Sequence, residues 1–76
     1  MYAKAIQKIF ERLVEKHKEK GESFRILTGK RLDEILCDEM EEWANTDNEK
    51  DEIEELCDIV VASIIKIEWL IQGGQK

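Results

Sequence analysis

Proline is absent from this 76-residue sequence. A proline inside a helix removes a hydrogen bond and clashes with the preceding turn, so its absence leaves room for long unbroken helices. The charged fraction is 39%, and the abundance of Ala, Glu, Lys, Ile and Leu is typical of helical proteins. We therefore expect an all-α fold.

Several motifs that carry chemistry are also missing. The sequence contains no glycine-rich phosphate-binding loop, no internal repeat, no low-complexity segment and no Ser/His/Asp set. Its single histidine, His17, closes an apolar helical stripe and has no evident nucleophile beside it. We interpret His17 as a structural or cap-adjacent residue, and nothing supports a P-loop enzyme or a serine hydrolase.

Long hydrophobic runs are equally scarce. The longest apolar run, residues 59–65, is too short to span a bilayer, and the first residues lack the apolar core of a signal peptide. Two cysteines, Cys37 and Cys57, lie in predicted regular helices and fit reduced thiols better than a disulfide framework. We expect a soluble, cytoplasmic protein with no membrane partner.

Basic residues are fewer than acidic ones, 12 against 18, so the net charge is −6. Because nucleic-acid phosphates are bound by clustered Lys and Arg, this balance argues against a nucleic-acid partner, and a helix-turn-helix DNA-binding protein is the least favoured hypothesis. A nucleotide bound through a metal ion remains compatible, since the cation carries the phosphate contact.

The period of the apolar residues predicts three helices. Their expected ranges are 1–20, 30–44 and 47–71. We expect one small antiparallel domain over residues 1–76, with a frayed end at 71–76. Because a chain this short buries only a thin core, oligomerisation is expected to complete a helical bundle.

The ends of these helices are indicated by local residues. Gly21 is expected to end the first helix, and residues 22–30 are expected to form an ordered loop that leads to Thr28 as the cap of the second. Thr46 and Glu49 have the spacing of a capping box at the start of the third.

Four carboxylates flank the turn between the second and third helices: Glu39, Glu42, Glu55 and Asp58. The members of each pair are three residues apart, so they share one helix face. Glu39 and Asp58 are equally far from the middle of the turn, and the other two are also equally far from it. In an antiparallel hairpin such residues sit at the same height, so we expect the four to converge.

Glu39 also falls within the apolar stripe of the second helix. That stripe consists of Leu32, Ile35, Leu36, Met40 and Trp43. An isolated charge there would cost roughly several kcal/mol, so Glu39 either has a basic partner or belongs to a hydrated functional site. A hard divalent cation would relieve the repulsion among the carboxylates, and oxygen ligands favour Mg²⁺, or Mn²⁺ as a substitute, over zinc.

The third predicted helix is apolar on two sides. One stripe consists of Ile53, Leu56, Cys57, Val60, Ile64, Ile67 and Ile71, and a second line of Ala62, Ile65 and Trp69. The second line continues the side that carries Glu55 and Asp58. A helix that is apolar nearly all round must be buried on more than one side. We therefore expect a homodimer or homotetramer whose interface runs along this helix and begins close to the acidic pair.

The carboxylate pattern resembles that of a known superfamily. Glu39-x-x-Glu42, twelve residues, then Glu55-x-x-Asp58 is similar to the E-x-x-E and E-x-x-D signature of the MazG-like all-α nucleoside triphosphate pyrophosphohydrolases, which include dimeric dUTPases and phosphoribosyl-ATP pyrophosphohydrolase. Residues 36–42, LCDEMEE, resemble the L-x-E-E-x-x-E pattern, and residues 54–60 resemble E-E-x-x-D-hydrophobic. The similarity covers about residues 32–65.

The resemblance implies a Mg²⁺-dependent enzyme that cleaves a nucleoside triphosphate between its α and β phosphates. The products would be a nucleoside monophosphate and pyrophosphate, as in house-cleaning of nucleotide pools. By the same resemblance the metal ligands would be Glu39, Glu42, Glu55 and Asp58, and subunits would associate through helices.

Further residues receive roles on chemical grounds. Glu39 and Glu42 are equal candidates for the base that deprotonates water. Lys16, Lys30 and Arg31 are candidates to neutralise the leaving pyrophosphate, and Arg25 is a candidate phosphate contact. Trp43 is either a base-stacking residue or a core or interface residue.

A competing hypothesis is a non-catalytic helical interaction or regulatory protein that binds a partner through the third helix. Glu39 separates the two, because an interaction protein has no need of a carboxylate on its core stripe.

Overall fold

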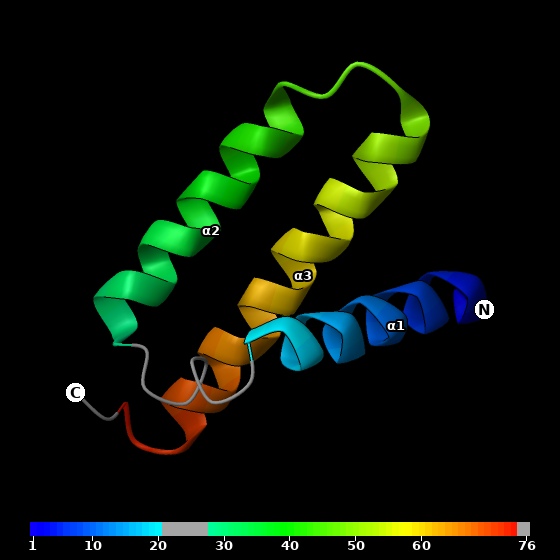
Figure 1. Ribbon diagram of the computed structural model, residues 1–76. Coiled ribbons are helices and arrows are strands. Elements are labelled where there is room, and N and C mark those ends of the chain that lie inside the picture. The colour runs from blue at the N-terminus through cyan, green and yellow to red at the C-terminus, as the bar shows by residue number, and fades with distance from the viewer. Residues whose placement is uncertain (21–27, 75–76) are drawn as a thin grey trace.

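The computed structural model describes residues 1–20 and 28–74. They form three helices, α1 (Ala3–Lys20), α2 (Gly29–Ala44) and α3 (Glu49–Ile71), and no strand occurs in the described part of the chain. Figure 1 shows α2 and α3 as an antiparallel hairpin, with α1 crossing α3. The predicted all-α fold is confirmed. Arg25 and the predicted helix-ending Gly21 lie outside the described residues.

The ends of α2 follow local side-chain chemistry. Thr28 caps the helix as predicted, because the backbone N–H of Arg31 donates to its hydroxyl oxygen at 3.1 Å. The helix begins at Gly29 and ends at Ala44, within one residue of the expected range.

The start of α3 differs from the predicted capping box. The helix begins at Glu49 rather than residue 47, and its cap is Asn48, whose side-chain oxygen accepts from the N–H of Asp51 at 2.9 Å. Thr46 instead donates its hydroxyl to the carbonyl of Trp43 at 2.8 Å, so it extends the end of α2. Starting at Glu49 places three acidic residues in the first turn, where the helix dipole favours negative charge.

The C-terminal end of α3 is closed by a glycine turn. Gly73 and Gly74 have positive φ values of 98° and 61°, and the N–H of Gly74 donates to the carbonyl of Trp69 at 2.9 Å. Left-handed glycines end helices in this way because they carry no Cβ.

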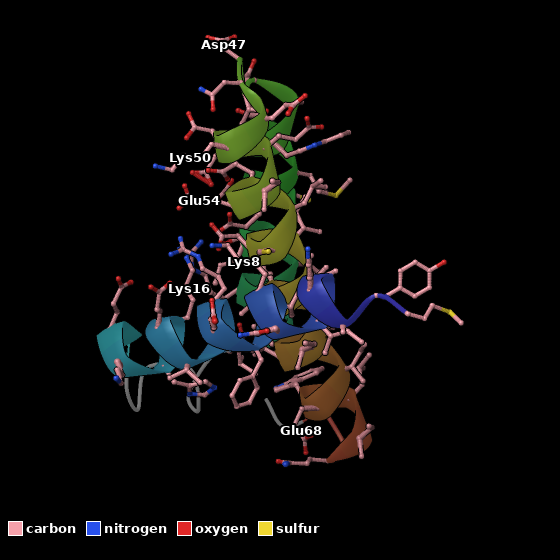
Figure 2. The ribbon with its side chains drawn as sticks, turned by 90° about the vertical axis from the view of Figure 1, so that its right-hand side faces the viewer. Lys8, Lys16, Asp47, Lys50, Glu54 and Glu68 are labelled. Atoms are coloured by element: carbon pink, nitrogen blue, oxygen red, sulfur yellow. The ribbon has the colours of Figure 1, made fainter. Side chains whose placement is uncertain are left out.

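The core of the described chain is small. Four apolar residues are buried, namely Leu32, Cys57, Val61 and Ala62. Three of them belong to α3, and Figures 1 and 2 show α2 beside that helix and α1 lying across it. α3 is therefore the central element, on which the other two helices pack.

The two apolar lines of α3 have different surroundings. Ala62 is buried, and Trp69 packs on Gly29 at the start of α2. The side that continues from the acidic pair thus packs against α2 of the same chain. In the other line Cys57 is buried, whereas its remaining members are 37–74% exposed: Ile53, Leu56, Val60, Ile64, Ile67 and Ile71. Among the described residues, no helix is both long enough and apolar enough to cross a membrane.

Candidate metal centre

Three of the predicted carboxylates converge between α2 and α3. Glu39 and Glu42 lie on α2, Glu55 lies on α3, and one oxygen of each lies within 4.8 Å of the others. The i, i+3 spacing and the short connection at 45–48 produce this arrangement, as the sequence predicted. Such a cluster of oxygen ligands could hold a hard divalent cation.

The fourth carboxylate, Asp58, is held by cations of α1. It is only 6% exposed, and the Nε and Nη2 groups of Arg12 donate to its two oxygens at 2.5 and 3.2 Å. The ammonium of Lys16 lies 4.0 Å from Oδ2. Asp58 therefore borders the cluster as a salt-bridged side chain, while its charge still acts on the neighbouring glutamates.

Glu39 is partly buried and lacks a partner for one of its oxygens. Its Oε2 atom is buried without a hydrogen bond. Burial, with the negative charges of Asp58 and Glu42, raises the pKa of Glu39 to about 7, and Lys16 opposes this rise. In the absence of a cation, this carboxylate is held in an unfavourable environment.

Glu55, on α3, resembles Glu39 in its burial and in its unsatisfied oxygen. Its Oε2 atom is also buried without a hydrogen-bond partner. Burial first, and then the charges of Glu42 and Asp58, raise its pKa. Each of the two helices thus contributes to the cluster a glutamate with one unsatisfied carboxylate oxygen, and hard cations bind such oxygen ligands.

A hollow of about 500 Å³ adjoins the cluster. Its charged lining includes Lys16 and Arg31, which are two of the predicted phosphate-binding residues. Its apolar lining consists of Leu32, Ile35, Val61, Ala62 and Ile65. Figure 2 shows Lys16 on the side of α1 that faces the N-terminal half of α3. The lining of the hollow therefore combines two cations, five carboxylates and an apolar part.

Two other predicted substrate residues lie elsewhere. Lys30 is exposed and does not line the hollow. Trp43 is 38% exposed, and its indole N–H donates to Glu52 at 3.2 Å, so it links the two helices near their connection. The structure therefore gives Trp43 a contact between helices and separates it from the hollow.

Arg12 was not predicted as a site residue, although the sequence contains a pattern that indicates its role. It precedes Lys16 by four residues, so the two cations share one face of the first helix, at the border of its apolar stripe. A basic pair at the edge of a core-facing stripe indicates an acidic partner on a neighbouring helix.

No protein-family model, curated protein or solved structure matches the chain. The described residues show a small all-α protein of three helices with a cluster of three glutamates.

Proposed function

We propose that the protein is a Mg²⁺-dependent nucleoside triphosphate pyrophosphohydrolase that cleaves the bond between the α and β phosphates. The observation that carries this proposal is the cluster of Glu39, Glu42 and Glu55, with two buried oxygens that have no hydrogen-bond partner. A surface patch of solvated acids would satisfy those oxygens with water. Their burial in the E-x-x-E and E-x-x-D pattern supports a site that is completed by a cation.

The donor set fits Mg²⁺, and Mn²⁺ as a substitute, because all the ligands are carboxylate oxygens. Glu39, Glu42 and Glu55 would hold the ion, and Asp58 would join them on exchanging its Arg12 partner. When bound, the ion supplies charge neutralisation for the phosphates and lowers the pKa of water near the phosphorus.

The chain's own residues supply the remaining functions. Lys16 and Arg31 face the hollow and would contact the phosphates, where they stabilise the charge that develops on pyrophosphate. Either Glu39 or Glu42 would take the proton of the attacking water.

The test is pyrophosphate release from a panel of canonical and modified nucleoside triphosphates, with Mg²⁺, with Mn²⁺ and with chelator. Glu39→Gln should lose at least about 100-fold in rate, the usual contribution of one general base. Glu54→Gln is the matched control, because Glu54 is the neighbour of Glu55 in sequence but lies outside the cluster. It should retain the wild-type rate.

A second function is favoured by one other observation, the exposed apolar line on α3. It suits a non-catalytic interaction protein. Failure to release pyrophosphate from any nucleotide, together with no effect of Mg²⁺ on the melting temperature, would overturn the enzymatic proposal in favour of this alternative.

A further inference from the structure

We infer that Arg12 determines how tightly the glutamate cluster binds a divalent cation, because it holds Asp58 as an internal counter-cation that the ion has to displace. The inference rests on the proposed function, since it takes the cluster of Glu39, Glu42 and Glu55 as the cation site. Arg12 acts through Asp58, so it is a positioning residue rather than a ligand.

The guanidinium of Arg12 engages both oxygens of Asp58. Its Nε group donates to Oδ1 at 2.5 Å and its Nη2 group donates to Oδ2 at 3.2 Å. Such two-point, charge-assisted pairs are strong and fix the orientation of the carboxylate. The pair is also sheltered, because the side chain of Asp58 is only 7% exposed. Asp58 is therefore held by α1 before any ion arrives.

Asp58 lies close enough to the cluster to interact with an ion bound there. It lines the hollow together with Glu39 and Glu42. Burial, and then neighbouring charges that include Asp58, raise the pKa of Glu39 and of Glu55. A divalent cation among the glutamates would attract Asp58 in the same way. The guanidinium on that carboxylate would repel the ion, and salt screens such a sheltered repulsion only weakly.

Arg12 has other acidic groups around it when it releases Asp58. Its Nη1 group already donates to Glu15 at 3.1 Å. Arg12 also lines a second, smaller hollow of about 120 Å³, whose carboxylates are Glu11, Glu15 and Glu54. Glu54 is labelled in Figure 2, on the N-terminal half of α3. The exchange therefore moves Arg12 from one carboxylate to others and leaves its charge paired.

The exchange reduces the affinity for the ion. A site that binds only after a competing contact opens has its affinity lowered by the fraction of protein in the open state. Replacing Arg12 should thus have two opposite effects, a lower melting temperature in chelator and tighter binding of Mg²⁺. A residue that merely supports the fold would weaken both.

The first test is calorimetric titration of the protein with Mg²⁺ and with Mn²⁺. Arg12→Gln should bind each ion at least about tenfold more tightly than the wild type, the scale of one hydrogen bond to a charged group. Arg12→Lys keeps the charge but loses the planar fork, so its affinity should fall between the two. Lys8→Gln is the control, because it removes the same charge one turn earlier on α1. Its affinity should stay within about threefold of the wild type.

A spectroscopic test follows Arg12 itself. The Nε–H signal of Arg12 in the ¹⁵N NMR spectrum is assigned by its loss in Arg12→Lys. Adding Mg²⁺ to the wild type should shift this signal, because the Nε–H group loses Asp58 as its acceptor. NaCl at matched ionic strength should leave it in place.

The outcomes separate this inference from the proposed function. If wild type binds Mg²⁺ but Arg12→Gln and Arg12→Lys bind it no more tightly, the inference is wrong and metal-dependent pyrophosphate release is unaffected. Equal tightening by Lys8→Gln would also overturn it, because loss of charge alone would then explain the effect. If no variant binds Mg²⁺, both the inference and the proposed function fail. Should Arg12→Gln not fold, Arg12→Lys and the wild-type Nε–H signal decide.

Discussion

The charged form of the Glu39 carboxyl group is disfavoured for two reasons: Glu39 lies on a core-facing stripe, and its neighbours are acidic. Its pKa is raised from 4.5 to about 7 by burial and by the charges of Asp58 and Glu42. The folded protein therefore holds a proton that the unfolded chain releases. This contribution to stability is fully present below pH 4.5 and is lost as the pH rises through 7.

We predict that metal-free Glu39→Gln melts at a higher temperature than the wild type at pH 8. The gain should be on the order of 5 °C, which for a domain of this size corresponds to roughly 1 kcal/mol for a partly screened carboxylate. At pH 5 the difference should nearly vanish, because the wild-type side chain is then protonated. Thermal melts in chelator at both pH values measure this, and an equal difference at both would contradict it.

Gly29 has a packing role that its residue type alone does not reveal. A Cβ added there would lie 2.6 Å from Cη2 of Trp69, so the indole lies directly against the helix backbone. We predict that Gly29→Ala destabilises the protein by about 1–3 kcal/mol, the usual cost of overpacking. This would occur although alanine in a helix is favoured over glycine by about 1 kcal/mol.

Trp69→Phe provides the control for Gly29, because phenylalanine lacks the outer ring atoms. In that background the cost of Gly29→Ala should fall markedly, as a double-mutant cycle of denaturant unfolding would report. If Gly29→Ala were equally destabilising in the Trp69→Phe background, its cost would not arise from a clash with the indole ring.

At the level of the helices, α1 is joined to the hairpin by a salt bridge as well as by apolar contacts. The side chain of Asp58 is 7% exposed, and that of Arg12 is 28% exposed. Removing Arg12 would leave a buried carboxylate that, among the described residues, has only Lys16, at 4.0 Å, to balance it. We predict that Arg12→Ala costs about 2 kcal/mol, less than a fully buried pair would.

Arg31→Ala is the matched change for Arg12→Ala. Arg31 pairs with Glu34 one turn away on the same helix, and both side chains are more than half exposed. Its loss should cost less than about 0.5 kcal/mol. Equal destabilisation by the two substitutions would show that the contact between α1 and α3 does not depend on the buried pair.

The helices and the glutamate cluster could be predicted because they depend on short-range order. Apolar periodicity predicted the ends of the helices to within two residues. The equal distances from the turn predicted that Glu39, Glu42 and Glu55 lie close together. The cap of α3 could not be fixed in this way, because several residues at 45–48 can cap a helix and the choice depends on the connection as a whole.

Contacts between distant helices were harder to predict. The partner of Asp58 is Arg12, 46 residues away, and no local pattern selects one cation of α1 over another. The side of α3 that packs against α2 was similarly ambiguous, because both of its lines are apolar. Only the position of α2 along α3 distinguishes the buried line from the exposed one.

For the whole molecule, the thin core and the acidic cluster lead us to expect that a bound cation would raise stability. We predict that Mg²⁺ raises the melting temperature at pH 8, with a gain of about 2.7 kcal/mol at 100 times its dissociation constant. Glu42→Gln should greatly reduce the shift. NaCl at matched ionic strength is the control for screening, and a shift of equal size in NaCl would remove the case for a specific ion.

The short connection between α2 and α3 also has a consequence for the order of assembly. Glu39 and Glu55 are only sixteen positions apart, and contacts of such short range form early in folding because they close small loops. α1 leaves the ribosome first, yet its anchor Asp58 follows Arg12 by 46 residues. The contact between α1 and α3 can therefore form only after the hairpin of α2 and α3 has been synthesised. We expect α1 to be the last helix to pack on this hairpin during folding and the first to detach from it during unfolding.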